Sequence, residues 1–303
     1  KERPLGFAAH MDQIEPCRNV NPVINGNIIS TDKTTTLGGD DKAGISAIME
    51  AVEDIIESGV PHRDIYLVFT CSEEISMMGT KHMDMSMLPC KELVVVDATG
   101  GAETLAYKAP AMEAIEITFK GKKAHAGIEP EKGINAIVVA SKAISKMHIG
   151  RIDYETTSNI GHIEGGSATN IVTDEVTFTA EIRSHSMEKL AAEVTHMEQC
   201  CKEAVEEMGA CYEMKHEMAY PVLSLEEDCE LIQDTVNAMA EEKITANKMI
   251  IGGGSDANVL AGHGYKSVIL GCGMINVHTV EEALDTDETW KVTKVLRRLM
   301  GAE

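Results

Sequence analysis

The feature that most constrains this chain is a series of short acidic and histidine motifs that follow apolar, strand-like runs. In chain order the motifs are His10-Met11-Asp12, Gly39-Asp40-Asp41-Lys42, Glu73-Glu74, Asp97 and His278-Thr279. The apolar runs are Pro4–Ala9, Tyr66–Thr70, Leu93–Val96 and Val268–Leu270. In open α/β sheets, binding sites form where the carboxyl ends of strands meet. The motifs therefore predict an α/β fold in which distant segments meet at one edge of a central sheet.

The side chains of these motifs are types that bind divalent cations. They comprise two imidazoles, three ligating carboxylates and one spare carboxylate, which suits a pair of cations and a catalytic base. His10 and Asp12 share one face of a strand, so one can bind a metal while the other holds the imidazole N–H. Glu73 and Glu74 point in different directions, so one can bind a metal while its neighbour faces the substrate.

A helix is predicted directly after Asp40-Asp41-Lys42. Apolar residues recur at helical spacing and Gly59-Val60-Pro61 ends the pattern; the apolar residues are Ile45, Ile48, Val52, Ile55 and Ile56. Acidic residues are also favoured at a helix N-terminus by capping and by the helix dipole. Because a cap needs only one aspartate, the other is available for a metal.

The composition excludes two classes of partner. A net charge of −22 and an aromatic content of 4% argue against nucleic acid, which needs a basic surface and stacking platforms. No apolar run approaches transmembrane length, so we expect no membrane partner. The eight cysteines contain no Cys-x-x-Cys pair, which is typical of reduced thiols in a cytoplasmic protein.

The middle of the chain has a different character, because no metal-ligand motif occurs between about Ala111 and Ala219. Its residue pattern predicts the order strand, helix, strand, strand, helix, strand, at Glu113–Lys120, Gly133–Met147, Ser158–Ile163, Glu175–Arg183, Met187–Met208 and Tyr212–Glu217. We expect the first helix to bury one stripe and the third strand to alternate as a half-exposed sheet would; the residues are Ile134, Ile137, Val138 and Ile144, then Val176, Phe178, Ala180 and Ile182. This order predicts an inserted ferredoxin-like domain.

Taken together, the motifs resemble those of the M20 family of metallopeptidases, in its peptidase T-like, tripeptide aminopeptidase-like branch. The resemblance runs from about Leu5 to the C-terminus. The stretches that carry it are Ala9–Asp12, Leu37–Gly44, Lys123–Gly127, Gly161–Asn170, Gly252–Asn258 and His278–Glu282.

The resemblance implies a role for each metal motif. His10 and Asp97 would hold one zinc ion, Glu74 and His278 would hold the other, and Asp40 would bridge them. Glu73 would be the general base and Asp12 would orient His10. The metal-bridged hydroxide would attack the peptide carbonyl, since two cations roughly 3.5–4 Å apart can lower the pKa of a shared water. The resemblance also implies a cis peptide bond between Asp40 and Asp41.

The resemblance implies two domains with different tasks. Residues 1–110 and 220–303 would form a zinc-peptidase-like catalytic domain, with a mixed central sheet flanked by helices. Residues 111–219 would form an α+β lid that mediates homodimerisation. Within the lid, His125 would help to hold the oxyanion, commonly at the partner's site, while Asn170 and Arg183 would contact substrate. An alternative for Arg183 is an ordinary salt bridge at a sheet edge.

The glycine-rich loop of the first domain is a further candidate site. It lacks the Gly-Lys-Ser/Thr of a phosphate loop, and we expect its glycines to allow positive φ and close approach to the main chain of the substrate. The candidate residues are Gly253, Gly254 and Ser255. Family members carry a helix and a strand ahead of the position of Lys1, so we expect the catalytic domain to lack its first part here.

We therefore expect a dinuclear zinc aminopeptidase that hydrolyses short peptides as tripeptidases do, with Co²⁺ or Mn²⁺ as alternative metals. The motifs leave open another amide hydrolase on the same scaffold, namely a carboxypeptidase, a dipeptidase or an N-acyl amino acid deacylase. They also leave open a catalytically silent protein that binds metal or peptide, although the presence of Glu73 argues against it.

Overall fold

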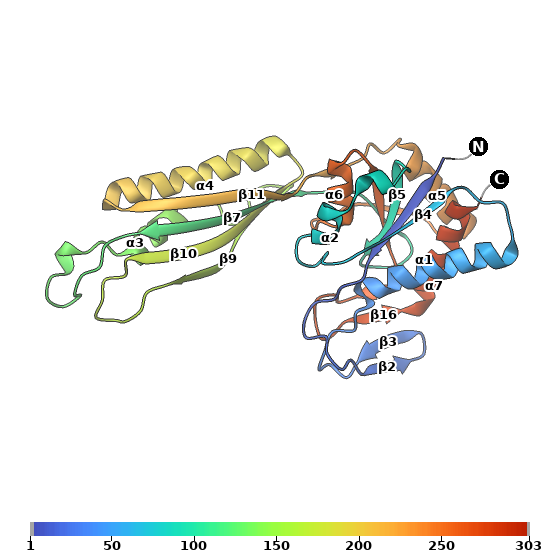
Figure 1. The fold of residues 1–303 in the computed structure, drawn as a ribbon, viewed down its shortest axis with the longest axis horizontal. Coiled ribbons are helices and arrows are strands. Elements are labelled where there is room, and N and C mark those ends of the chain that lie inside the picture. The colour runs from blue at the N-terminus through green and yellow to red at the C-terminus, as the bar shows by residue number, and fades with distance from the viewer. Residues whose placement is uncertain (1–2, 302–303) are drawn as a thin grey trace. The chain divides into compact units, whose positions relative to one another are not determined.

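The structure is a computed structural model and describes residues 3–301. The chain divides into two compact units (Figure 1). The first contains the residues up to Ala109 and from Leu223 onward, and the second spans Pro110–Val222.

The first unit is built on a mixed sheet of seven strands, counted over the described residues. Its order is β12-β6-β14-β5-β1-β4, with β13 also pairing with β6. Strand β1 pairs in parallel with β4 and β5, and β5 pairs in parallel with β14, whereas β6 runs antiparallel to β14. The strands are β1 (Leu5–His10), β4 (Ile65–Thr70), β5 (Glu92–Ala98), β6 (Thr104–Ala109), β12 (Leu223–Ser224), β13 (Asn247–Ile250) and β14 (Lys266–Gly271).

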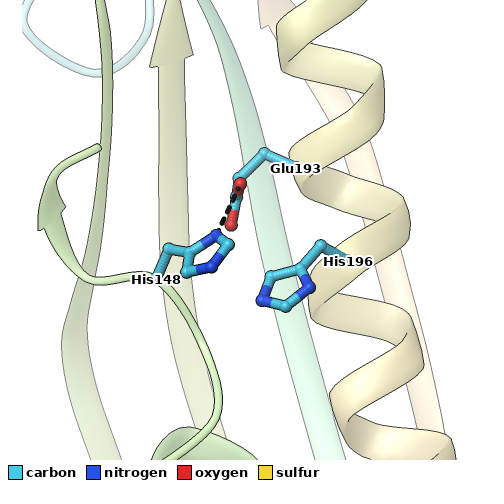
Figure 2. Close-up of side chains that lie close together, drawn as sticks. All are labelled: His148, Glu193 and His196. Carbon is cyan, nitrogen blue, oxygen red and sulfur yellow. Dashed lines mark hydrogen bonds and ion pairs between the residues drawn. The ribbon is translucent and has the colours of Figure 1, made fainter. Parts of the chain in front are cut away.

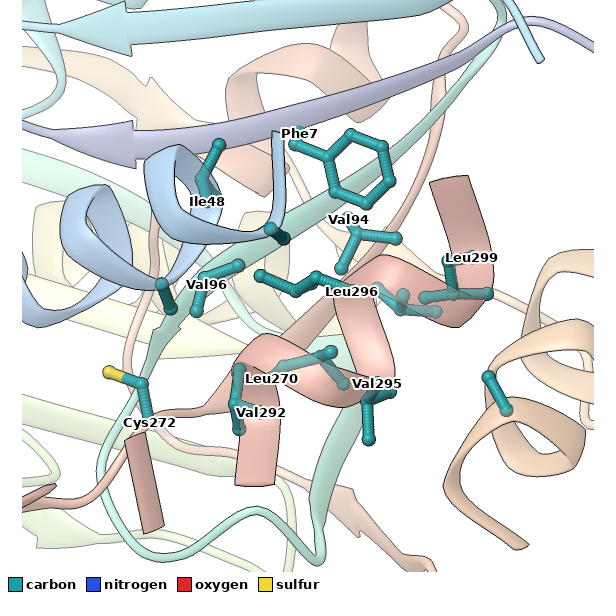
Figure 3. Close-up of a cluster of buried hydrophobic side chains, with 14 of the residues drawn as sticks. Phe7, Ile48, Val94, Val96, Leu270, Cys272, Val292, Val295, Leu296 and Leu299 are labelled. Carbon is teal, nitrogen blue, oxygen red and sulfur yellow. The ribbon is translucent and has the colours of Figure 1, made fainter. Parts of the chain in front are cut away.

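Helices cover both faces of this sheet. One face packs against α1 (Gly39–Ser58), α5 (Glu230–Glu241) and α7 (Thr286–Met300). Figure 3 shows this core, in which Phe7 and Val94 of the sheet meet Ile48 of α1 and Leu296 of α7. The other face packs against α6 (Asp256–Gly262), which contacts the short helix α2 (Met78–His82) near the 3₁₀ turn Met85–Met87. Burial on both faces explains the continuous apolar runs of β1 and β5.

A small antiparallel sheet, which the sequence did not predict, lies in the same unit. Its order is β15-β16-β3-β2. It joins the segment after His10 to the segment that carries His278, because β2 and β3 come from the former and β15 and β16 flank the latter. The strands are β2 (Pro22–Asn25), β3 (Ile28–Thr31), β15 (Met274–Ile275) and β16 (Ala283–Asp285).

The second unit has the predicted order of elements. Its antiparallel sheet runs β11-β7-β10-β9-β8, and α3 and α4 pack on each other and on β7 and β10. The ferredoxin-like topology and the α/β class of the chain are thus confirmed. The elements are β7 (Ala111–Lys120), a 3₁₀ turn (Pro130–Lys132), α3 (Ala136–Ile144), β8 (Gly150–Arg151), β9 (Thr156–Gly165), β10 (Glu175–Ser184), α4 (Met187–Met208) and β11 (Cys211–Tyr220).

The apolar face of α3 was predicted only in part, whereas that of β10 was predicted correctly. Val176, Phe178, Ala180 and Ile182 of β10 are all buried. In α3, by contrast, Ile137 and Val138 are 44% and 41% exposed, and the buried residues are Ala136, Val139, Ala140 and Ala143. Small residues let α3 approach the sheet closely, and of the predicted stripe only Ile134 and Ile144 pack against this core. The helix is also shorter than predicted.

Two features outside the sheets complete the description. Among residues 3–301, none of the helices combines the length and the apolarity needed to cross a membrane. All eight cysteines are free thiols, and the neighbours Cys200 and Cys201 are both buried on α4.

Helix α1 offers a matched test of the core. Ile48 is fully buried between α1 and the sheet, whereas Ile56 is 73% exposed on the same helix. We expect Ile48→Ala to lower the free energy of unfolding by about 2–5 kcal/mol, because it leaves a cavity. Ile56→Ala should stay within about 0.5 kcal/mol. Urea unfolding followed by the fluorescence of Trp290, the single tryptophan, measures both; equal losses would contradict the packing.

Candidate metal centre

The predicted metal ligands come from segments that meet at the carboxyl edge of the central sheet. His10 ends β1, and Asp97 lies near the end of the adjacent strand β5. Glu73 and Glu74 follow β4 on the other side of β1. The parallel pairing of these three strands therefore brings their ends together, as open α/β sheets do. Asp40 is added by the start of α1, and His278 by the segment between β15 and β16.

Asp40 is the centre of this cluster, since its two carboxylate oxygens face different imidazoles. His10 Nε2 lies 2.9 Å from Asp40 Oδ1 and 3.6 Å from Asp97 Oδ1. His278 Nε2 lies 3.2 Å from Asp40 Oδ2 and 2.9 Å from Glu74 Oε2. The structure thus brings all five predicted ligands into one cluster, arranged as two half-sites that share Asp40.

The electrostatics of the cluster suit cations. Burial raises the pKa values of Glu73, Glu74 and Asp97, and the neighbouring carboxylates raise them further. Burial lowers the pKa of His10, but its interactions with Asp40 and Asp97 outweigh this effect and raise it to about 12. These shifts show how strongly the buried negative charges require a positive partner. Imidazole and carboxylate are also the ligands that zinc accepts, so the residues fit a metal centre.

Asp12 does more than the sequence predicted. Its Oδ1 lies 3.5 Å from His10 Nδ1, close to the expected orienting contact. Its two oxygens also accept hydrogen bonds from the backbone N–H groups of Glu73 at 3.0 Å and Glu74 at 3.2 Å. Asp12 therefore holds the turn that presents both glutamates, in addition to standing beside His10.

The two adjacent aspartates at the start of α1 have separate tasks. Asp41 is fully buried and accepts hydrogen bonds from the backbone N–H groups of Gly44 at 3.1 Å and His10 at 3.2 Å. Asp41 therefore supplies the cap-like contact, which leaves Asp40 free to face the imidazoles. The Asp40–Asp41 peptide bond is cis, as the resemblance implied.

Glu282 is a site residue that sequence reasoning missed. It is 2% exposed, and its Oε2 accepts hydrogen bonds from the N–H groups of Leu37 at 2.7 Å and Gly38 at 3.0 Å. Its Oε1 accepts a third from the N–H of Asp40 at 3.0 Å. Glu282 thus ties the segment after His278 to the loop that positions Asp40. The only sequence signal was its place in the His278–Glu282 stretch, where Glu281 stands beside it.

A cavity of about 450 Å³ opens over the cluster within the first unit. His10, Asp40, Glu73 and His278 line it, together with the loop Gly252–Ser255. The expected positive φ is absent at Gly252 and Gly253, where an added Cβ would meet no atom within 4 Å. These two glycines therefore leave open space beside the cavity. Ser255 is buried, and its side chain caps α6 by accepting a hydrogen bond from Ala257 N at 3.2 Å.

The candidate residues of the second unit lie in two places. His125 is exposed, and its Nδ1 accepts a hydrogen bond from Gly127 N at 3.1 Å. The N–H of Ala126 donates to the carbonyl of Asn170 at 2.9 Å, so the loops that carry His125 and Asn170 are neighbours. Arg183, on β10, pairs with Glu181 at 2.9 and 3.0 Å, which matches its alternative interpretation as a salt-bridge residue.

Known proteins resemble this chain along nearly its whole length. An aminopeptidase PepT from Bacillus cereus is 36% identical, with a TM-score of 0.91 over 98% of this chain and 80% of that one. A tripeptidase from Staphylococcus aureus is 35% identical, with a TM-score of 0.94 over the same shares. The uncharacterised protein YqjE of Bacillus subtilis is 41% identical over 96% of this chain and 78% of its own length. Residues 112–209 match the family described as a peptidase dimerisation domain of the M20 type, and residues 13–121 match the M42 glutamyl aminopeptidases.

The chain belongs to the M20 family of metallopeptidases, in its peptidase T-like branch. It is thus an M20 peptidase, and its activity is on peptides. The match to the peptidase dimerisation domain falls within the second unit. The cluster of candidate metal ligands and the cavity over it lie in the first unit.

Glu281 and Glu282 provide a matched test of how the M20 centre is held. We expect Glu282→Gln to lower the free energy of unfolding by about 1.5–3 kcal/mol, because three N–H groups lose a charged acceptor. Glu281 is 54% exposed and pairs with Lys33, so Glu281→Gln should change it by less than about 0.5 kcal/mol. Urea unfolding of both variants measures the two changes in the free energy of unfolding. If Glu282→Gln matched the stability of Glu281→Gln, the three hydrogen bonds would have no structural importance.

Proposed function

We propose that this M20 peptidase is a dinuclear zinc aminopeptidase that releases the N-terminal residue of short peptides, tripeptides among them. The observation that carries the proposal is the position of Asp40, whose two oxygens face His10 and His278 separately on the floor of a cavity. The similarity to an aminopeptidase and to a tripeptidase supports the choice of substrate.

Two divalent cations would be held by the two half-sites. His10 and Asp97 would bind one, Glu74 and His278 the other, and Asp40 both. When bound, the cations supply Lewis acidity and lower the pKa of water from 15.7 towards about 7. The imidazole and carboxylate donors favour zinc, with Co²⁺ or Mn²⁺ as alternatives.

Glu73 is the general base in this proposal. Its carboxylate lines the cavity and, among the described residues, makes no ion pair with either imidazole, in contrast to Glu74. Its backbone is fixed by Asp12, so its side chain is held beside the ligands without being one. Glu73 would take the proton of the attacking water and pass it to the leaving amine. A positioned base of this kind contributes about 100- to 10,000-fold to the rate.

The cavity loop and the second unit would complete the site. Gly253 and Gly254 would leave room for the main chain of the peptide, with Ser255 fixing the end of their loop. The match to a peptidase dimerisation domain supports a homodimer. Because His125 Nδ1 accepts a hydrogen bond, a neutral His125 carries its proton on Nε2 and can donate it to an oxyanion. Asn170, in the neighbouring loop, and Arg183 would contact substrate.

Hydrolysis of matched tripeptides tests the proposed specificity. We expect the zinc-loaded protein to release the N-terminal residue of a free tripeptide. An N-acetylated tripeptide should be a poor substrate, whereas a tripeptide amide should be cleaved. Separation of the products by mass spectrometry identifies the bond that breaks. Release of the C-terminal residue would instead indicate a carboxypeptidase, and release of acetate would indicate a deacylase.

Mixed dimers test whether His125 acts across the dimer. We expect Glu73→Gln and His125→Ala to be nearly inactive as homodimers, since removal of an oxyanion donor typically costs about 100- to 1,000-fold. Co-refolding the two variants should restore up to about a quarter of the sites, if subunits pair at random in a two-fold dimer. Persistent inactivity, with heterodimers shown to form, would mean that His125 does not serve the partner's site.

A further inference from the structure

A second cluster of metal-binding side chains lies in the second unit, among residues that the proposed reaction does not use. It consists of His148, Glu193 and His196, shown in Figure 2. Glu193 and His196 are one helical turn apart on α4, and His148 belongs to the connection between α3 and β8. The potential ligand atoms of the three residues lie within 4.8 Å of one another.

The buried carboxylate of Glu193 lacks a full set of partners. Glu193 is 7% exposed, and its Oε2 lies 3.2 Å from His148 Nδ1. Within the described chain, its other oxygen, Oε1, is buried without any hydrogen-bond partner. Burial of an ionised carboxylate is costly unless its charge and both its oxygens are satisfied. The exposed imidazole of His148 contacts only Oε2, as the dashed line in Figure 2 marks, so this requirement is half met.

The ring of His196 is oriented by a backbone carbonyl. Its Nε2 lies 3.3 Å from the carbonyl oxygen of Lys146, which can only accept, so Nε2 carries the proton. The lone pair is then on Nδ1. Imidazoles that bind metals usually donate their other N–H to a backbone carbonyl or a carboxylate in this way. Cys200 Sγ also approaches Nε2, at 3.7 Å, but burial raises the pKa of its thiol, so it remains a neutral neighbour.

The two imidazole rings lie against each other. Their rings are stacked, with centroids 4.0 Å apart and planes inclined by 15°. The lone pair of an imidazole nitrogen lies in the plane of its ring, so one of the two rings must turn before both can bind the same ion. A simple His148–Glu193 ion pair would need no second imidazole. The second unit contains such a simple pair, in which His216 Nδ1 lies 2.5 Å from Glu113 Oε1.

We propose that His148, Glu193 and His196 form a zinc site that fastens the connection after α3 to helix α4. Two imidazoles and one carboxylate, with an open fourth position for water, are a common zinc ligand set. Donor atoms around a zinc ion lie roughly 3.3 Å apart, given bonds of about 2.0–2.1 Å. His148, whose side chain is 55% exposed, would turn to bring its lone pair to the ion.

The zinc content of variants of the full chain tests this site independently of the M20 centre. The test compares wild type with three variants, His148→Ala, His196→Ala and Glu193→Gln. Each protein is equilibrated with free zinc buffered at roughly 1 μM, and its bound zinc is measured by elemental analysis. We expect each variant to hold one zinc per chain fewer than wild type, with peptidase activity retained. The result is the difference in zinc content between wild type and each variant. The test therefore stays valid even if the proposed number of catalytic metals is wrong.

His216→Ala is the matched control, because it removes a half-exposed histidine of the second unit that also pairs with a buried glutamate. It should keep the zinc content of wild type. Hydrogen exchange of residues 145–149 provides a second measurement: zinc should slow it in wild type and leave it unchanged in His148→Ala. Equal zinc contents in wild type and in the three cluster variants, or uptake at the cluster only in millimolar zinc, would overturn the proposal.

Discussion

The structure of the first unit depends on one constraint, which is the crowding of buried carboxylates at the carboxyl edge of the sheet. Like charges in a poorly hydrated place repel one another and raise each other's pKa. The buried acids satisfy this constraint in two different ways. Some accept hydrogen bonds from the backbone or from hydroxyl groups, whereas others face the cavity and the imidazoles. This division separates the acids that build the site from those that can bind a metal.

The acids that build the site are all tied to protein donors. Asp12 accepts from the turn at Glu73-Glu74, and Glu282 accepts from the loop before Asp40. Asp256 accepts from the hydroxyl groups of Thr70 and Thr80, each at 2.5 Å. These bonds connect segments that are far apart in the chain, so the backbone of Asp40 and Glu74 is held by residues outside the ligand set. Such support is what a preorganised metal centre requires.

The meeting of the predicted ligands in one cluster could be foreseen from the sequence because the signals are local. His10, Asp40 and Asp97 follow recognisable strands or begin a helix, and parallel pairing brings those ends together. The function of Glu282 could not be predicted, since Glu281 has the same side chain and only the tertiary fold decides which of the two is buried. The buried face of α3 was missed in part for a related reason. Close packing against the sheet favours Ala140 and Ala143 there, so residue size outweighs the hydrophobicity of Ile137.

The shared position of Asp40 is the central claim, and anomalous diffraction at the zinc edge from zinc-loaded crystals tests it most directly. The account predicts two peaks roughly 3.5–4 Å apart, with one oxygen of Asp40 bound to each ion. One ion should also contact His10 and Asp97, and the other Glu74 and His278. A single peak, or two peaks with Asp40 turned away from one of them, would contradict the account.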